Sequence, residues 1–460
     1  MQITTQTDTI IAQCTPSGTG ALALIRISGP QACAVIGNKI SQLSSKKLLS
    51  DAASHTIHHG YIVDEDNKPI DEVLFFIMHA PRTFTGEHTV EISCHNNPFV
   101  IENIIERCIQ AGARLAQPGE FSRQAIENGK MNILQAEAIK ELIHAQTQEA
   151  LKLSLQQVRG TFSQHLQTLE TSLLKATALC EASFEFLEED VSFSAEIMDI
   201  LNDIQTKISS LTLLFNQQKQ IRDGIRIALI GTVNAGKSSL FNALIGKNRA
   251  IVTNIAGTTR DSIEYGVYQD GHYWTVIDTA GLRITDDAIE QEGINRSYNE
   301  AETADIVLFV IDGARQTDEE LRIHKNFIIT YPEKCITVIN KLDLLTNMQN
   351  SSSAKNVHTL CVSAQTQQNI HVLKEEIMKK IDALFSQTSS SFLLNKRHYS
   401  LLQSCSSELA YAQNILSTSG EFELISLHLQ KALSLISELT GKSISEKTMD
   451  SIFKDFCIGK

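Results

Sequence analysis

The 460-residue chain lacks the features that mark several classes of protein. No apolar run reaches the length of about 20 residues that a membrane-spanning helix needs, and the polar N-terminus has no basic and apolar signal. The nine cysteines include no CxxC pair and no His/Cys cluster at zinc spacing, so we expect reduced and mostly buried thiols. The net charge of −13 gives no basic footprint for stand-alone nucleic-acid binding. We therefore expect a cytoplasmic protein with no membrane partner.

A phosphate-binding loop is the clearest feature that the chain does contain. Residues 231–238 have the sequence GTVNAGKS, between an apolar run at 225–230 and apolar residues at helical spacing at 239–245. Strand, loop and helix form the context that this motif requires. Backbone N–H groups would hold the phosphates, Lys237 would neutralise their charge, and Ser238 would offer its hydroxyl to Mg²⁺. The sequence thus predicts a nucleoside triphosphate site.

Three later segments, each after an apolar strand-like run, indicate which nucleotide binds. Asp343, in the NKLD run at 340–343, can accept from N1–H and the exocyclic amine of guanine, a donor pair that adenine lacks. The Ser-Ala pair at 363–364 suits the loop behind the base. Asp278, in the DTAG run at 278–281, can hold Mg²⁺ through water, and a glycine N–H there can sense the γ-phosphate. Together with the phosphate-binding loop these segments form four motifs, in the chain order 231–238, 278–281, 340–343 and 363–364, and this order predicts a GTPase domain.

Two details of this domain bear on hydrolysis. Leu282 occupies the position where Ras-like proteins have the glutamine that orients the attacking water, and an apolar side chain cannot do that. Arg260 and Arg283 lie in plausible switch segments, but neither is identified as an arginine finger. Asn234 either helps bind a monovalent cation beside the phosphates or only shapes the loop, and the residues alone leave these alternatives open.

Proline is scarce, and its distribution divides the chain. Six of the seven prolines lie between Pro16 and Pro118, where short β-rich runs at 21–27, 73–78 and 90–94 alternate with turn signals. This pattern predicts an α+β domain over 1–118. Apolar residues then recur at steps of three and four, which predicts one long amphipathic helix. The stripe consists of Leu151, Leu155, Val158, Phe162, Leu166, Leu169 and Leu173.

Helical patterns return after the GTPase segment, at 393–417 and at 424–456, with an interruption near Gly441. Helices therefore flank the GTPase domain on both sides. The simplest organisation is a helical domain formed by 119–220 and 384–460, with a P-loop domain of α/β type inserted at 221–383. Polar, serine-containing stretches at 351–353 and 387–391 suit loops.

The chain ends in Phe-Cys-Ile-Gly-Lys after an amphipathic helix. The two residues that follow Cys457 do not fit a prenylation signal. Cys457 is either a mobile thiol whose pKa the neighbouring Lys460 lowers, or a buried cysteine at a helix end.

The whole chain resembles the MnmE (TrmE) family of tRNA-modification GTPases. Besides the nucleotide motifs, the resemblance rests on runs at 8–12, 24–29, 85–87, 94–95, 118–121, 128–130, 135–138 and 257–261 and on the terminal CIGK. It implies an N-terminal tetrahydrofolate-binding domain that also mediates homodimerisation, a helical domain, and an inserted Ras-like GTPase domain. The function implied is modification of the tRNA wobble uridine at C5, as a heterotetramer with the FAD-dependent partner MnmG.

The resemblance also assigns residues. A tetrahydrofolate derivative (5-formyl- or 5,10-methylene-) would be bound by Arg26, Glu91, Lys130 and Lys460, with Cys457 as a candidate catalytic thiol. Mg²⁺ would bind Ser238 and Thr259. K⁺ would bind Asn234, Thr253, Ile255 and Thr258, in place of an arginine finger, and Glu290 would orient the water, with Lys237 also catalytic. The GTP-binding set would be Asn234, Ala235, Gly236, Lys237, Ser238, Ser239, Thr253, Asn254, Ile255, Ala256, Gly257, Thr258, Thr259, Asp278, Thr279, Ala280, Gly281, Asn340, Lys341, Leu342, Asp343, Ser363, Ala364 and Gln365.

Two points stay open at this stage. Asn96 and Asn97 stand where the family has two glycines, so the turn beside the expected folate site differs from the family pattern. A second function class is a GTPase switch or ribosome-assembly factor with no chemistry outside the GTPase domain. The folate-site residues and the Cys457 tail distinguish the two classes, because a switch needs neither.

Overall fold

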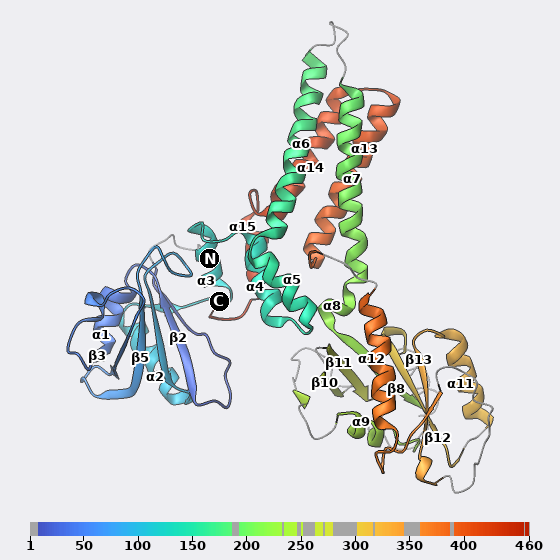
Figure 1. Ribbon diagram of the computed structural model, residues 1–460. Helices are drawn as coiled ribbons and strands as arrows, with labels where there is room; N and C mark the ends of the chain where they lie inside the picture. The colour runs from blue at the N-terminus through green and yellow to red at the C-terminus, as the bar shows by residue number, and fades with distance from the viewer. Residues whose placement is uncertain are drawn as a thin grey trace. The chain divides into compact units, whose positions relative to one another are not determined.

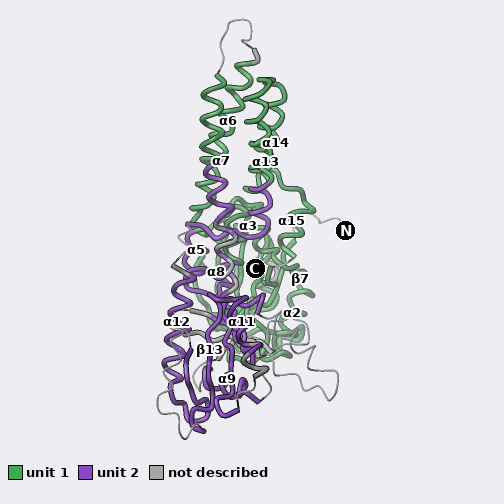
Figure 2. Tube along the Cα trace, turned by 90° about the vertical axis from the view of Figure 1, so that its right-hand side faces the viewer, with its two compact units in different colours: residues 1–140, 157–204, 404–460 green, residues 141–156, 205–403 purple. Residues whose placement is uncertain are grey.

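The computed structural model describes residues 8–185, 193–231, 234–245, 250–251, 263–269, 272–278, 301–315, 318–344, 359–386, 391–454 and 456–459. The chain divides into two compact units (Figure 2). Unit 1 comprises residues 1–140, 157–204 and 404–460, and unit 2 comprises residues 141–156 and 205–403. The predicted four-segment division of the chain stays a prediction. Among the described residues, no helix is long and apolar enough to cross a membrane.

The N-terminal part of unit 1 is a seven-stranded sheet with the order β3-β4-β5-β6-β2-β1-β7 (Figure 1). Neighbouring strands are antiparallel except β1 and β7, which are parallel. The strands are β1 (Ile10–Gln13), β2 (Leu22–Ser28), β3 (Ser41–Leu43), β4 (Thr56–Val63), β5 (Pro69–Met78), β6 (Thr89–His95) and β7 (Arg114–Leu115). The β-rich runs expected at 21–27, 73–78 and 90–94 lie in β2, β5 and β6.

One face of this sheet packs on helix α2 (Pro98–Ala111), whose Ile101, Ile104 and Cys108 join strand residues in one buried core. The Asn97 side chain caps α2 by accepting a hydrogen bond from Phe99 N at 3.0 Å. The asparagine pair that departs from the family pattern therefore supplies the start of this helix. Three further segments of this domain form short helices or helical turns. They are η1 (Ala32–Gly37), α1 (Asn38–Ile40) and η2 (Leu49–Asp51).

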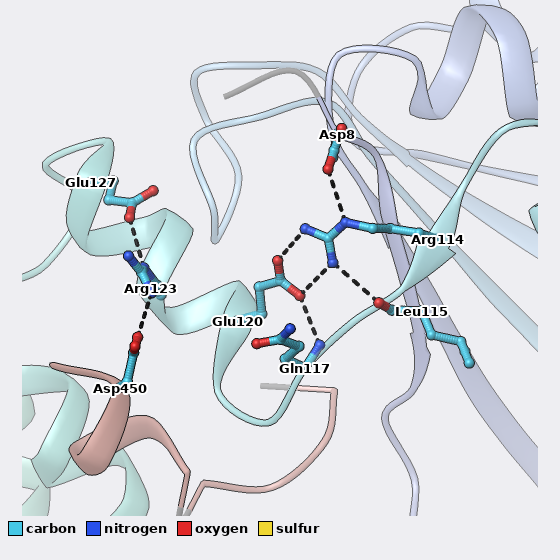
Figure 3. A network of polar contacts seen from close by, with 8 residues as sticks. All are labelled: Asp8, Arg114, Leu115, Gln117, Glu120, Arg123, Glu127 and Asp450. Atoms are coloured by element: carbon cyan, nitrogen blue, oxygen red, sulfur yellow. Dashed lines mark hydrogen bonds and ion pairs between the residues drawn. The ribbon is translucent and has the colours of Figure 1, made fainter. Parts of the chain in front are cut away.

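Two arginines connect successive elements of unit 1, because Arg114 joins the sheet to the next helix and Arg123 joins that helix to one near the C-terminus (Figure 3). Arg114 on β7 pairs with Asp8 at 3.0 Å and with both carboxylate oxygens of Glu120, which begins α3 (Glu120–Glu127). Arg123 on α3 pairs with Asp450 at 2.8 Å, on α15 (Glu446–Phe453). The hydrogen bond to Glu120, together with the one to Asp8 and the charges of both carboxylates, raises the pKa of the Arg114 guanidinium, although burial opposes this rise. Networked pairs of this kind fix geometry better than isolated surface pairs.

The helical region contains the remaining helices outside the GTPase segment. They are α4 (Ile133–His144), α5 (Gln148–Val158), α6 (Thr161–Glu185), α7 (Ser194–Gln217), α8 (Lys219–Asp223), α13 (Lys396–Thr418) and α14 (Phe422–Thr440), with α3 and α15 already named. Helix α6 packs along α14 (Figure 1). Gly441, with φ +85°, ends α14, as the expected interruption at this residue requires.

The prediction of one long helix through 151–173 is wrong. The segment forms α5 and α6, which are separated at Gly160, with φ +90°. Leu151 and Leu155 are exposed, while α5 buries Leu153. The spacing of apolar residues is the same on both sides of the break, so it could not reveal that a left-handed glycine ends the first helix.

Unit 2 contains the second sheet, with the order β14-β13-β12-β8-β11-β10-β9. Its central strands are parallel and nearly all buried, as expected for a sheet covered on both faces. One face packs on α9 (Lys237–Ile245) and α12 (Ile370–Ser386), and the other on α11 (Asp318–Thr330). The strands are β8 (Ile225–Gly231), β9 (Ala250–Ile251), β10 (Ile263–Gln269), β11 (His272–Asp278), β12 (Ile306–Asp312), β13 (Cys335–Asn340) and β14 (Thr359–Cys361).

Candidate functional site

The phosphate-binding loop connects β8 to α9, as the sequence predicts. β8 lies beside β12, with Gly231 opposite Val310. A Cβ on Gly231 would lie 2.1 Å from the Val310 carbonyl oxygen, so only glycine fits where β8 ends. Asn234 is exposed and has φ +67°, a left-handed conformation that asparagine tolerates. Lys237, the first residue of α9, donates a hydrogen bond to the Gly231 carbonyl at 2.8 Å.

Asn340 joins the phosphate-binding loop to the loop behind the base. Its side chain is buried, donates to the Ala235 carbonyl at 3.0 Å and accepts from Ala364 N at 3.1 Å. A Cβ on Gly236 would lie 2.3 Å from the Asn340 amide nitrogen. The absence of that carbon from Gly236 lets the Asn340 side chain reach the loop. Three motifs far apart in the sequence therefore share one side chain.

Asp343 lies in the turn η4 (Leu342–Leu344), directly after β13. It accepts a hydrogen bond from the Ser363 hydroxyl at 2.5 Å, and that hydroxyl accepts from Thr366 N at 3.1 Å. Leu342 N donates to the Val362 carbonyl at 3.1 Å, which holds the two loops together. These hydrogen bonds fix the orientation of the Asp343 carboxylate, and its contact with guanine stays a prediction. Gln365 is exposed.

The structure adds one residue that the sequence reasoning missed. Asp312, at the end of β12, pairs with Lys341 at 2.6 Å, and Lys341 has φ +65°. Burial raises the pKa of the Asp312 carboxyl, but hydrogen bonds from Lys341 and Ala314 N outweigh burial and hold this pKa below its ordinary value. The signal in the sequence is the position of Asp312 at the end of a fully apolar strand, beside the strand that carries NKLD.

Several candidate residues lie outside the described part of the chain. They are Thr253, Asn254, Ile255, Ala256, Gly257, Thr258, Thr259, Thr279, Ala280, Gly281, Glu290 and Lys460, together with Arg260, Leu282 and Arg283. The backbone of Asp278 ends β11, beside β8 in the sheet. Ser238 and Ser239 are exposed in the first turn of α9.

A second group of candidate residues lies in unit 1, where Arg26 on β2 is paired with Glu91 on β6. The two residues lie opposite each other in the antiparallel ladder, and the Arg26 guanidinium contacts the Glu91 carboxylate at 2.7 Å. Both side chains are largely buried. The guanidinium also lies over the rings of Phe84 and Phe121, 5.4 and 5.6 Å from their centroids. A buried pair flanked by aromatic rings is suited to a flat, polar ligand.

Lys130 approaches the same region from the segment after α3. Its ammonium donates to the Pro81 carbonyl at 2.7 Å, and the neighbouring Asn128 donates to the Thr85 carbonyl at 2.8 Å. Both acceptors belong to the loop between β5 and β6, which also carries Phe84. This loop therefore connects Lys130 with the Arg26 and Glu91 pair.

The C-terminal tail reaches this group of residues. The Gly459 carbonyl accepts from the Cys14 thiol at 3.3 Å and lies 3.5 Å from the Arg26 guanidinium. Gly459 has φ +93°, and a Cβ there would lie 2.6 Å from the Gln13 carbonyl oxygen. The structure brings together Arg26, Glu91 and the residue before Lys460, which lie far apart in the sequence.

The base of the tail is fixed against Gly119. The Cys457 carbonyl accepts from Gly119 N at 3.4 Å, and Phe453 and Phe456 pack over Gly119. Phe456 is buried, and the Lys140 ammonium lies 5.7 Å from the centre of its ring. Cys457 itself is exposed, so the alternative of a buried cysteine at a helix end is wrong.

Comparison with known proteins covers nearly the whole chain. A family model described as the MnmE helical domain matches residues 133–457, and one described as the GTP-binding protein TrmE N-terminus matches residues 9–130. A tRNA modification GTPase MnmE of Christiangramia forsetii is 36% identical, over 98% of this chain and 99% of the relative. The chain belongs to the MnmE family of tRNA modification GTPases.

Other MnmE relatives agree. Those of Lachnoclostridium phytofermentans and Chlorobaculum tepidum are 37% and 35% identical, and the matches cover 99% and 98% of this chain and 100% and 97% of the relatives. This family membership confirms the predicted fold class and the predicted enzyme class, a GTPase. The match to the MnmE helical domain begins before β8 and ends after β14, so it encloses the GTPase segment, as insertion into that domain requires.

Proposed function

We propose that this protein is the GTP-hydrolysing subunit of a complex that modifies the wobble uridine of tRNA at C5. The substituent would be aminomethyl or carboxymethylaminomethyl, and the complex would pair a homodimer of this chain with the FAD-dependent MnmG in the cytoplasm. Family membership and the nucleotide loops joined by Asn340 support the GTPase part. The assignment of tRNA, dimer and partner rests on the family resemblance.

One observation favours this function over a pure GTPase switch. The chain holds a second polar site in unit 1, outside the GTPase segment. There Arg26 and Glu91 pair across two strands, and the Gly459 carbonyl of the C-terminal tail accepts from the Arg26 guanidinium. A switch needs neither the pair nor a C-terminal tail placed against it.

The residues of this second site fit a tetrahydrofolate derivative. Cationic side chains, Arg26 and Lys130, can pair with the glutamate carboxylates of a folate, and the Glu91 carboxylate can accept from pterin N–H groups. When bound, the folate would supply the one-carbon unit. The role of Cys457, which is exposed at the base of the tail, would be to act on that unit as a thiol.

In the GTPase site, Ser238 and Thr259 would bind Mg²⁺, and Asn234, Thr253, Ile255 and Thr258 would bind K⁺. Asn234 is exposed and left-handed in this loop, which supports this role. A cation there would supply positive charge where it develops during phosphoryl transfer. Glu290 would orient the water that Leu282 cannot.

The direct test is reconstitution of the full-length protein with MnmG, unmodified tRNA, a tetrahydrofolate donor, glycine or ammonium, and GTP, followed by mass spectrometry of the wobble nucleoside. Lys237→Ala should abolish GTP hydrolysis, and Arg26→Ala should abolish modification while K⁺-stimulated hydrolysis continues. Hydrolysis without any modified uridine, in the wild type with all components present, would favour the switch.

Cys457→Ser tests the thiol separately, with Cys361→Ser as a matched control because Cys361 is also exposed but lies in unit 2. We expect modification to be lost in the first variant alone, with GTP hydrolysis unchanged in both. Normal modification by Cys457→Ser would exclude a catalytic thiol.

A further inference from the structure

Cys33, His79 and His88 lie together in the N-terminal domain, and none of them is among the residues assigned to nucleotide or folate. One potential ligand atom from each lies within 4.8 Å of the others. His79 follows β5 and His88 precedes β6, and these strands are antiparallel with Met78 opposite Thr89. The pairing therefore brings the two histidines side by side at the base of the loop 80–87, and Cys33 joins them from η1.

The spacing of these atoms matches a zinc site. His79 Nδ1 and His88 Nδ1 are 3.3 Å apart, and Cys33 Sγ lies 3.9 Å from His79 Nδ1. Zinc bonds of about 2.0–2.1 Å to nitrogen and about 2.3 Å to sulfur place tetrahedral ligand atoms roughly 3.3 Å (N to N) and roughly 3.6 Å (S to N) apart. The two histidines have this separation already, and the Cys33 sulfur lies a few tenths of an ångström beyond it from His79 and within 4.8 Å of His88.

The orientation of the His79 ring also favours a zinc site. Its Nε2 lies 2.9 Å from the Ala52 carbonyl, which can only accept, so Nε2 carries the proton and Nδ1 presents its lone pair to His88 and Cys33. Metal-binding histidines characteristically donate their other ring N–H to a carbonyl or carboxylate in this manner. The His79 backbone is fixed as well, because its N–H donates to the Ser54 hydroxyl at 2.9 Å.

A hydrogen-bonded trio without metal satisfies these groups less well. A neutral imidazole nitrogen has one lone pair, yet both the Cys33 thiol and the His88 ring approach the same Nδ1. A bound divalent ion would accept lone pairs from both histidines and the sulfur, with release of the thiol proton to solvent.

We propose that Cys33, His79 and His88 bind one Zn²⁺ ion, with water as the fourth ligand, and that this ion ties both ends of loop 80–87 to η1. The loop provides Phe84 beneath Arg26 and the Pro81 carbonyl that accepts from Lys130. Zinc would therefore fix the conformation of a loop that carries two contacts of the candidate folate site. Nothing in the family resemblance assigns a metal to these residues.

The test uses the full-length protein, stripped of metal with a chelator and titrated with Co²⁺ and then Zn²⁺. We expect the protein to bind one equivalent of Co²⁺ in tetrahedral geometry, with a sulfur-to-cobalt charge-transfer band. Zn²⁺ should then displace the Co²⁺, and the band should disappear. Cys33→Ser should remove the band, and both Cys33→Ser and His88→Gln should weaken binding by about 100-fold or more, since loss of an outer-shell partner alone costs roughly 10–100-fold.

Cys94→Ser is the matched control, because Cys94 is also a buried cysteine of this domain. It should keep the cobalt band. Absence of stoichiometric Co²⁺ in the wild type, or a band that persists in Cys33→Ser, would overturn the site, and this wild-type measurement does not depend on whether any variant folds. Hydrogen exchange of residues 80–87 should slow on Zn²⁺ addition, and unchanged exchange would refute the tie to the loop.

Discussion

Gly119 offers the sharpest test of how the C-terminal tail is held. It has φ +71°, and a Cβ there would lie 2.7 Å from Phe453 Cδ1 and 3.0 Å from the Cβ atoms of Phe453 and Phe456. Gly420, in the turn between α13 and α14, has a similar φ of +65° with nothing within 4 Å of an added Cβ. Gly119→Ala and Gly420→Ala therefore share the backbone strain and differ in the collision with the tail.

The magnitudes follow from this comparison. A left-handed alanine costs about 1–2 kcal/mol at either position. Overpacking against the phenylalanines adds about 1–3 kcal/mol at Gly119 only. The free energy of unfolding should fall by about 2–5 kcal/mol for Gly119→Ala and by about 1–2 kcal/mol for Gly420→Ala.

Urea unfolding can separate the two units, because the single tryptophan, Trp274, is buried in unit 2. Gly119→Ala should move the transition followed by circular dichroism more than Gly420→Ala does, with the Trp274 fluorescence midpoint unchanged. It should also weaken binding of 5-formyl-tetrahydrofolate, since the tail brings Gly459 to Arg26. Equal destabilisation by the two variants, with equal folate affinity, would refute the role assigned to the tail.

Three further predictions concern single polar contacts. Asn340→Ala should lower the free energy of unfolding reported by tryptophan fluorescence by about 2–6 kcal/mol, because two buried backbone groups each lose a partner worth about 1–3 kcal/mol. An unchanged midpoint of urea unfolding would contradict this. Asp343→Asn should move nucleotide preference from GTP towards xanthosine triphosphate, whose carbonyl replaces the guanine amine, and retained GTP preference in a competition assay would argue against the guanine contact. The hydrogen bond and charge of Asp71 raise the pKa of His95 above its ordinary value of 6.5. The stabilising effect of this pair is therefore fully present below pH 6.5 and is lost as the pH rises through the raised pKa. The urea midpoints of wild type and Asp71→Asn should converge with rising pH, and divergence would contradict the assignment.

The sequence predicts the GTPase sheet well because its central strands are buried on both faces and form continuous apolar runs. β8, β11 and β13 lie where the runs before the nucleotide motifs place them. The stripe through 151–173 misleads because Gly160 breaks the helix without changing the apolar spacing. Periodicity reports which face is apolar and not where the backbone turns.

Contacts between distant segments could not be predicted from one sequence. The pairing of Arg26 with Glu91 depends on the register of β2 against β6, and the approach of Gly459 depends on how the tail packs on Gly119. The group of Cys33 and its two histidines has no local spacing that matches a zinc motif, because two of its segments meet only through the β5–β6 pairing.

We propose that this one chain joins a GTPase to a one-carbon site that acts on tRNA. The most direct measurement is reconstitution with MnmG, tRNA and a tetrahydrofolate labelled isotopically in its one-carbon unit, followed by mass spectrometry of the wobble uridine. We predict that the label appears at C5 with GTP and K⁺, and is lost when GTP is omitted or when Arg26 is replaced by alanine. A wobble uridine without label, despite active GTP hydrolysis, would contradict the claim.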